Sequence, residues 1–308
     1  MTRLLNATFI TFVLCAVCCQ ASGQTKLKVV TTTLDMADFA EQVGGDRAEV
    51  YPIFTGKYDI HFFEPRPSQV IKLREADLLI VAGLDIDIWI RALIDAARNP
   101  RVLFGASGYV DPSVGVRPIQ VPEGRIDGSM GDVHPYGNPH FWFTQENVRI
   151  AVNNICEGLS RVSPENAQVF TERKDLYLKE VERTCGELHA KLAPLKGAKM
   201  VEYHQSWDYF ADEFGLEIVA TLEPKPGIPP SPAHLSEVVA TMKSAGARLL
   251  LVEPYYPQKP VQFVVKQTGA KVLRLPLYLG GKEGITTYLD NLRYNVNSIV
   301  EALSSVTK

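Results

Sequence analysis

The sequence predicts an α/β fold of two sandwich lobes with mostly parallel sheets, joined by one long helix. Short β-prone runs alternate with helical stretches through both halves of the 308-residue chain, which is the pattern of an α/β architecture. Two of the runs, 77–83 and 248–253, are largely apolar, as expected for parallel strands covered on both faces. Between the halves, a stretch of about 30 residues keeps helical spacing and would be about 45 Å long.

The first half of the chain contains four candidate strands and four candidate helices. Strands are expected at 28–33, 48–53, 77–83 and 101–104, and helices at 38–45, from 67 onward, at 89–97 and at 146–159. Glycine at 44 and 45 is a helix-ending signal, and Pro67 suits a first helical position. The segment 112–139 carries five prolines and five glycines with little periodicity, so we expect a long surface loop with a functional or mobile role.

The long helix is expected to begin at Ser163-Pro164, where proline takes the first helical position. Apolar residues keep roughly helical spacing as far as Pro194. They are Val169, Leu176, Val181, Leu188 and Leu192. Because such a helix is longer than one small lobe, we expect it to run along both lobes as a stiff connector.

The second half repeats the alternation. Strands are expected at 199–203, 216–221, 248–253 and 271–275, and helices at 207–214, 233–244, 261–268 and 286–304. Five prolines in the nine residues 224–232 predict a stiff segment that serves as a second crossing between lobes. The resulting organisation is a signal peptide at 1–23, a first lobe at 24–162, the connecting helix at 163–195 and a second lobe at 196–308.

The N-terminus has the features of a secretory signal peptide. Arg3 precedes a mostly apolar stretch too short for a comfortable membrane span, and small residues at 21–23 provide a cleavage site. An uncleaved anchor is the alternative. Cleavage after Gly23 removes one basic residue, so the formal net charge goes from −3 to −4. This balance does not indicate a nucleic-acid partner.

Three of the five cysteines lie in the segment to be removed. Lipid attachment is weakly signalled, because Val17 precedes Cys18 and no small residue precedes Cys19. The mature chain keeps Cys156 and Cys185, which an oxidising compartment would allow to pair. Two buried free thiols are the other interpretation.

Three histidines share one kind of setting. His61, His140 and His204 each lie on an expected loop, beside aromatic residues and a proline or strand end. His61 and His204 each follow an expected strand, one in each half of the chain. Ligands of open α/β sheets bind at the edge where the carboxyl ends of the strands lie. We therefore predict a metal site shared by the two lobes. His189 and His234 fall inside expected helices, which favours surface or internally partnered side chains.

Several segments resemble those of the substrate-binding proteins of zinc and manganese ABC transporters. The similarity is carried by 59–68 (DIHFFEPRPS), 137–142 (GNPHFW), 204–210 (HQSWDYF), 223–228 (EPKPGI) and 251–254 (LVEP), in matching order and spacing. It covers essentially the whole mature chain. The resemblance implies two α/β lobes joined by a long helix, with the metal in the cleft between them.

The resemblance also implies a ligand set and a role. His61 and His140 would bind the metal from the first lobe and His204 from the second, in an extracytoplasmic protein that delivers metal to a membrane ABC permease. Manganese-selective members tend to have a carboxylate where this chain has His204. Three imidazoles favour Zn²⁺, with Mn²⁺ as the second choice. We expect a periplasmic monomer that is not an enzyme, with a lipid-anchored form as the alternative.

The sequence departs from the family pattern in two places. The fourth ligand is usually an aspartate after the last strand, but 275–281 contains no acid. Water would take that position, or a carboxylate from Glu64, Glu223 or Glu253. Zinc members often carry a His-rich loop before the second histidine, and here that loop has only His134 with the acids Glu123, Asp127 and Asp132. It would assist capture rather than store metal.

Two other functions fit a three-histidine site. A zinc-dependent hydrolase would use the open fourth position, although it needs a general base near the metal-bound water, and the sequence has no HExxH motif. A metal-binding surface adhesin is the other alternative. Turnover that disappears with chelator would identify the hydrolase, and retention on the outer surface the adhesin.

Overall fold

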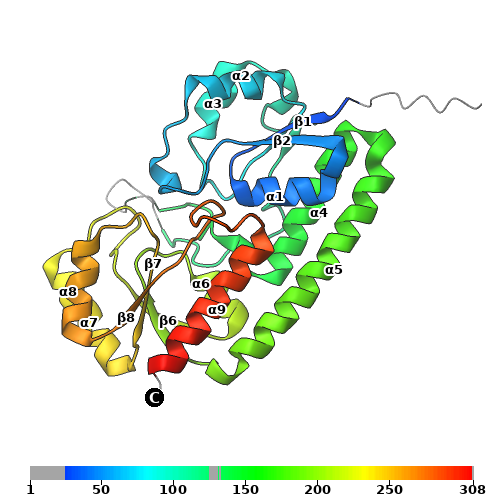
Figure 1. Cartoon of the computed structure of the whole chain (residues 1–308). Helices are drawn as coiled ribbons and strands as arrows, with labels where there is room; N and C mark the ends of the chain where they lie inside the picture. The colour runs from blue at the N-terminus through cyan, green and yellow to red at the C-terminus, as the bar shows by residue number, and fades with distance from the viewer. Residues whose placement is uncertain (1–24, 125–130, 132, 307–308) are drawn as a thin grey trace, which may run out of the picture.

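The computed structural model describes residues 25–124, 131 and 133–306. It contains two lobes, each built on one four-stranded parallel sheet, with a long helix along one side (Figure 1). The predicted fold class is confirmed. The proposed signal peptide at 1–23 lies outside the described residues.

The first lobe has the strand order β2-β1-β3-β4. Its elements are β1 (Leu27–Thr31), α1 (Leu34–Gly44), β2 (Ala48–Pro52), α2 (Pro67–Glu75), β3 (Leu78–Ile80), α3 (Ile90–Ala97), β4 (Tyr109–Val110) and α4 (Gln145–Val162). Short 3-10 helices lie at η2 (Ile60–Phe62), η3 (Pro100–Val102) and η5 (Phe141–Phe143).

The expected strand at 101–104 is wrong. Pro100 begins η3 there, and the side chain of Asn99 accepts a hydrogen bond from the backbone N–H of Arg101 at 3.1 Å. A proline at the first position with a capping Asn favours a helical turn over an extended strand. The edge strand is instead formed by β4, which pairs with β3.

The second lobe has the order β6-β5-β7-β8, the same arrangement in chain order as the first. Its elements are β5 (Lys199–Glu202), α6 (Asp208–Phe214), β6 (Glu217–Thr221), α7 (Pro232–Ala245), β7 (Leu249–Val252), α8 (Gln258–Thr268), β8 (Lys271–Arg274) and α9 (Tyr288–Val306). The expected strands of this half are all present.

The strands β3 and β7 are buried along their whole length, and neighbouring residues of a strand point to opposite faces of the sheet. In β3, Leu78 and Ile80 join the main core, whereas Leu79 joins a separate core under α2 and α3. In β7, Leu249 and Leu251 join the same main core, and Leu250 faces α7 and α8. One hydrophobic core therefore continues from the first lobe into the second.

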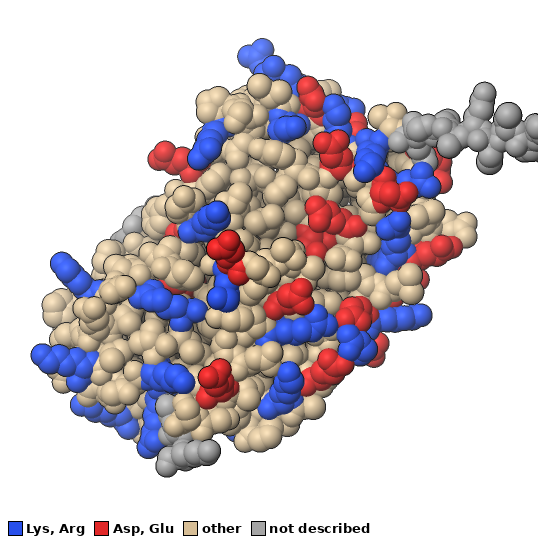
Figure 2. All heavy atoms as spheres, viewed as in Figure 1, with Lys and Arg blue, Asp and Glu red and all other residues tan. Residues whose placement is uncertain are grey.

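The long helix α5 (Ala167–Leu192) has 26 residues and a length of about 39 Å. It packs against α1 and α4 of the first lobe and against α9, and it runs past both lobes in Figure 1. Acidic and basic side chains are interspersed on the face shown in Figure 2. On α5, Arg183 pairs with Glu180 and Glu187. The expected connecting helix is confirmed.

The second crossing between lobes is not the proline-rich segment 224–232. That segment joins β6 to α7 and stays within the second lobe. The chain returns to the first lobe after β8, where the backbone N–H of Leu279 donates to Asp35 at 3.3 Å and that of Tyr288 to Asp38 at 2.9 Å. The paired residues lie 244 and 250 positions apart in the chain, so local composition did not indicate these contacts.

Cys156 of α4 and Cys185 of α5 are free and buried. Burial raises the pKa of Cys185 to about 12, which keeps its thiol protonated. Of the two interpretations of this pair, the structure shows the free thiols. Among the helices in the described part of the chain, none is both long and apolar enough to cross a membrane.

Candidate metal site

Three separate loops carry the three predicted ligands. His61 lies in η2, in the connection that follows β2, and His140 immediately precedes η5. His204 follows the end of β5 by two residues. The first two histidines thus come from the first lobe and the third from the second. His61 and His204 lie in connections that follow strands β2 and β5, whereas His140 lies at the start of η5.

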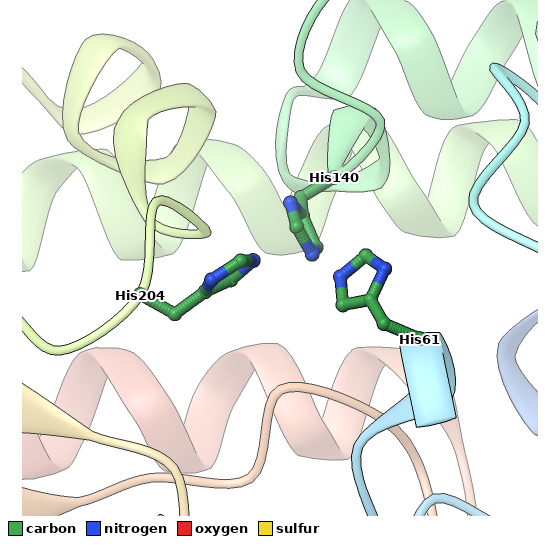
Figure 3. Close-up of side chains that lie close together, drawn as sticks. All are labelled: His61, His140 and His204. Atoms are coloured by element: carbon green, nitrogen blue, oxygen red, sulfur yellow. The ribbon is translucent and has the colours of Figure 1, made fainter. Parts of the chain in front are cut away.

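The structure brings His61, His140 and His204 together. One ring nitrogen from each lies within 4.8 Å of the others, and the three rings converge in Figure 3. The ring centroids of His61 and His140 lie 5.3 Å and 5.4 Å from that of His204. The Nε2 atom of each is buried with no hydrogen-bond partner. Leaving a buried polar atom unpaired costs about 1–3 kcal/mol. A cation bound between the three nitrogens would give each of them a partner.

Neighbouring polar groups fix two of the rings. Nδ1 of His140 lies 3.0 Å from Oδ1 of Asn138. Nδ1 of His204 lies 2.8 Å from Oε2 of Glu223, whose side chain is only 8% exposed. A ring that donates from Nδ1 presents the lone pair of Nε2, which is the usual arrangement of a metal-binding histidine and its outer partner.

His61 is positioned through its backbone. Its N–H donates to Oδ1 of Asp59 at 3.0 Å, which caps η2. Oδ2 of Asp59 accepts a hydrogen bond from the hydroxyl of Tyr256 at 3.2 Å. Because Tyr256 follows β7 in the second lobe, this carboxylate links the turn that carries His61 to the opposite lobe. Asn138 makes a similar link, donating to the carbonyl of Gln205 at 3.1 Å.

The charges around the site favour neutral imidazoles in the first lobe. Burial and then the proximity of His204 hold the pKa values of His61 and His140 well below 6.5. Burial also acts to lower the pKa of His204, but the hydrogen bond and charge of Glu223, together with the charges of Glu253 and Asp59, outweigh it and the pKa is raised. A neutral imidazole is the form that binds metal.

None of the three carboxylates considered for the fourth position joins the cluster. Glu64 is exposed, and Glu223 is bonded to Nδ1 of His204. Oε1 of Glu253 accepts from the hydroxyl of Ser206 at 2.5 Å, and burial raises the pKa of Glu253 to about 7. Among the described residues, no carboxylate oxygen lies within 4.8 Å of the ligand atoms of all three histidines.

The remaining histidines fall into two groups. His134 lines a pocket of about 50 Å³ together with His140 and His204. His189 lies 2.8 Å from a carboxylate oxygen of Glu213, and His234 lies 3.1 Å from the carbonyl of Thr221. These last two are internally partnered, as predicted. Of the acids near His134, Asp127 and Asp132 lie outside the described residues.

Sequence reasoning missed the residues that orient the ligands. Asn138 was part of a recognised segment but had no role, and Glu223 was considered as a ligand rather than as the partner of His204. A local signal existed for Asn138, because an Asn two residues before a residue often bonds to its backbone N–H. No local signal pointed to Tyr256, which is 197 residues from Asp59.

The chain has two α/β lobes, each with a parallel sheet, and one long helix connects them. Histidines from both lobes meet between the lobes. This arrangement defines a two-lobed substrate-binding protein. The chain matches the family model of zinc-uptake complex component A, periplasmic (ZnuA), over residues 29–302. It belongs to this family of metal ABC transporter substrate-binding proteins.

Similar proteins carry several metals in their names. The iron-binding protein YfeA of Yersinia pestis is 26% identical, over 90% of this chain and 86% of its own length. The manganese ABC transporter substrate-binding lipoprotein PsaA of Streptococcus mitis is also 26% identical, over 92% of this chain and 91% of its own length.

Solved structures share the fold. A laminin-binding adhesin (Lmb) mutant from Streptococcus agalactiae superposes with a TM-score of 0.77 at 26% identity, covering 90% of this chain and 99% of that one. A crystal structure of ZnuA superposes with a TM-score of 0.76 at 24% identity, covering 90% of this chain and 99% of that one.

Proposed function

We propose that this protein captures zinc between its lobes and delivers it to the membrane permease of an ABC importer. His61, His140 and His204 would be the ligands. The observation that carries the proposal is the convergence of three buried, unpartnered Nε2 atoms from both lobes. Binding there would satisfy all three atoms and join the lobes through the ion.

The donor set supports zinc over manganese. Imidazole nitrogen suits Zn²⁺, whereas Mn²⁺ prefers oxygen, and no described carboxylate oxygen joins the three nitrogens. Relatives are named for manganese and iron, so the family likeness alone does not select the metal. The preference for zinc therefore rests on the ligands of this chain, with Mn²⁺ as the competitor to test.

We further propose that the chain acts in the periplasm as a monomer, after removal of residues 1–23, with 24–162 and 196–308 as lobes around the connector 163–195. A lipid anchor is the alternative, and PsaA of Streptococcus mitis is named a lipoprotein. Fractionation and mass spectrometry of the mature N-terminus separate the two forms, because a lipid anchor adds a fixed mass to the terminal cysteine.

We propose binding and delivery rather than catalysis. A zinc hydrolase needs a free base next to the metal-bound water, and Glu223, the carboxylate bonded to His204, is already occupied by that ring. Zinc-loaded protein should show no chelator-sensitive cleavage of ester, peptide or lactam substrates. An adhesin role, suggested by the likeness to Lmb, would require retention on the outer cell surface.

The test is elemental analysis of the purified protein followed by competitive zinc and manganese titration. Alanine at His61, His140 or His204 should each weaken zinc binding by more than about 100-fold, because each removes a direct ligand and even outer partners contribute about 10–100-fold. His189→Ala is the matched control and should bind like the parent. Equal or tighter binding of manganese by the parent would overturn the choice of zinc.

A further inference from the structure

A fourth histidine has the same unsatisfied nitrogen as the three candidate ligands. His134 precedes His140 by six residues, and its ring centroid lies 5.0 Å from that of His61. Its Nε2 atom is buried and has no hydrogen-bond partner. His134 also lines the pocket that contains His140 and His204. A fourth imidazole with a free nitrogen therefore lies beside the three candidate ligands.

Two hydrogen bonds position His134 beside the other histidines. The backbone N–H of Gly137 donates to the carbonyl of His134 at 3.2 Å, so the two histidines 134 and 140 flank one turn. The ring of His134 also makes a hydrogen bond with the backbone of Asp85, whose carboxylate pairs with Arg91 at 2.9 Å. Because Nε2 is the unpartnered atom, the bond to Asp85 leaves it free for a ligand.

The coordination chemistry of the site calls for one more donor. Zinc sites that hold the ion tightly are four-coordinate, and three histidines leave one position. No carboxylate of the described chain takes it. His134 lies outside the group whose ligand atoms are all within 4.8 Å of one another, so its side chain has to move toward the other three nitrogens when the ion binds.

We propose that His134 is the fourth ligand, so that the metal is held by four imidazoles; this inference rests on the proposed function. A four-nitrogen site has no open position for a reactive water, which suits a protein that carries its ion. It also replaces the carboxylate oxygen that would favour manganese. Zinc prefers tetrahedral coordination and nitrogen donors, so a site of four imidazoles selects zinc.

The test is X-ray absorption spectroscopy of the zinc-loaded full-length mature protein, which counts imidazoles from their multiple scattering. Four imidazoles are expected in the parent and three in His134→Ala and His134→Gln. Zinc affinity should fall by about 10–100-fold in both variants. Replacement of the nitrogen by water should also change the visible absorption of the cobalt-loaded protein.

Controls separate this inference from the proposed function. His189→Ala should keep four imidazoles and the parent affinity, and metal-free His134→Ala should melt at the parent temperature. An equal imidazole count in the parent and both His134 variants, with unchanged affinity, would overturn the inference and leave the proposed function standing. Failure of the parent to bind zinc at all would instead overturn the proposed function.

Discussion

At the scale of single residues, the hydrogen-bond partner of a ligand determines how that ligand presents its nitrogen to the metal. The charge of Glu223 acts on His204 through a single hydrogen bond of 2.8 Å to Nδ1. That bond fixes the ring, makes Nε2 the donor to the metal and increases its basicity. Asn138 does the same for His140 without a charge. The two lobes thus contribute ligands of different electrostatic character.

Glu223→Gln should weaken zinc binding by about tenfold, and Glu223→Ala by about 100-fold. Glutamine still accepts the hydrogen bond but lacks the negative charge, whereas alanine leaves Nδ1 without a partner. Competitive titration with a chelator of known affinity measures both. Glu217→Gln, at an exposed position of β6, is the control, and a Glu223→Gln variant that binds like this control would contradict the role.

The affinity for zinc should fall as the pH is lowered, beginning above pH 6.5. The pKa of His204 is raised above 6.5, while those of His61 and His140 lie well below it. A proton on His204 must leave before the metal binds, so each pH unit below its pKa should cost about tenfold in affinity. The other two rings add their own proton competition only at lower pH.

Titrations from pH 8 to pH 5, with proton release followed by calorimetry, check this. About one proton per zinc is expected where His204 is charged. In Glu223→Gln the decline should begin at lower pH, because the charge that raises the pKa of His204 is gone. A flat affinity over the whole range would rule out a histidine site.

The sequence was sufficient to propose the three histidines as ligands but not to identify the residues that surround and orient them. His61, His140 and His204 could be proposed because each has aromatic neighbours and a strand end or proline beside it in the chain. Which nitrogen faces the site depends on Asn138 and Glu223, and Glu223 approaches from a different loop. The position of His134 likewise depends on the path of a long loop that has no periodicity to interpret.

At the scale of elements, local signals predicted most helices and strands, and tertiary contacts decided the rest. The apolar run at 101–104 resembled a strand, but Asn99 and Pro100 made it a helical turn, and the short β4 took the edge. The return of the chain at 275–288 depends on two buried acids of α1, Asp35 and Asp38, which accept backbone N–H groups from it. In the sequence, Asp38 is the first residue of an expected helix and Asp35 lies before it, and neither shows a signal for this contact.

Asp35→Asn should stabilise the fold more at pH 8 than at pH 4.5. Burial raises the pKa of Asp35 from 3.8 to about 7, so the folded state favours the protonated acid. The unfolded chain ionises near pH 4, and the stability contributed by this group is lost as the pH rises toward 7. Asparagine accepts the bond from Leu279 without a charge, and the difference in gain should be about 1–3 kcal/mol.

Urea unfolding of the parent and Asp35→Asn at the two pH values measures the difference. Asp95→Asn, at an exposed position of α3, is the control and should show no such dependence on pH. An Asp35→Asn variant whose change in unfolding free energy is the same at both pH values would mean that Asp35 is ionised in the fold.

At the scale of the whole molecule, the lobes share more than the candidate site. The main core includes Leu78 of the first sheet and Leu249 of the second, and α5 packs against α1, α4 and α9. The hydrogen bond from Tyr256 to Asp59 and that from Asn138 to Gln205 add contacts beside the histidines. Two lobes connected by core, helix and site should unfold together.

Zinc should therefore stabilise the entire chain in one cooperative transition. A ligand that binds only the folded state at 100 times its dissociation constant adds about 2.7 kcal/mol, which for a cooperative unit of this size corresponds to a rise of roughly 4–5 °C in Tm. Differential scanning calorimetry at several zinc concentrations measures the shift. In His204→Ala the rise should disappear at the same zinc concentration, because the second lobe no longer contributes its ligand. Two separate transitions, of which zinc moves only one, would show that the metal is held by a single lobe, and would contradict both the shared site and the coupling of the lobes through it.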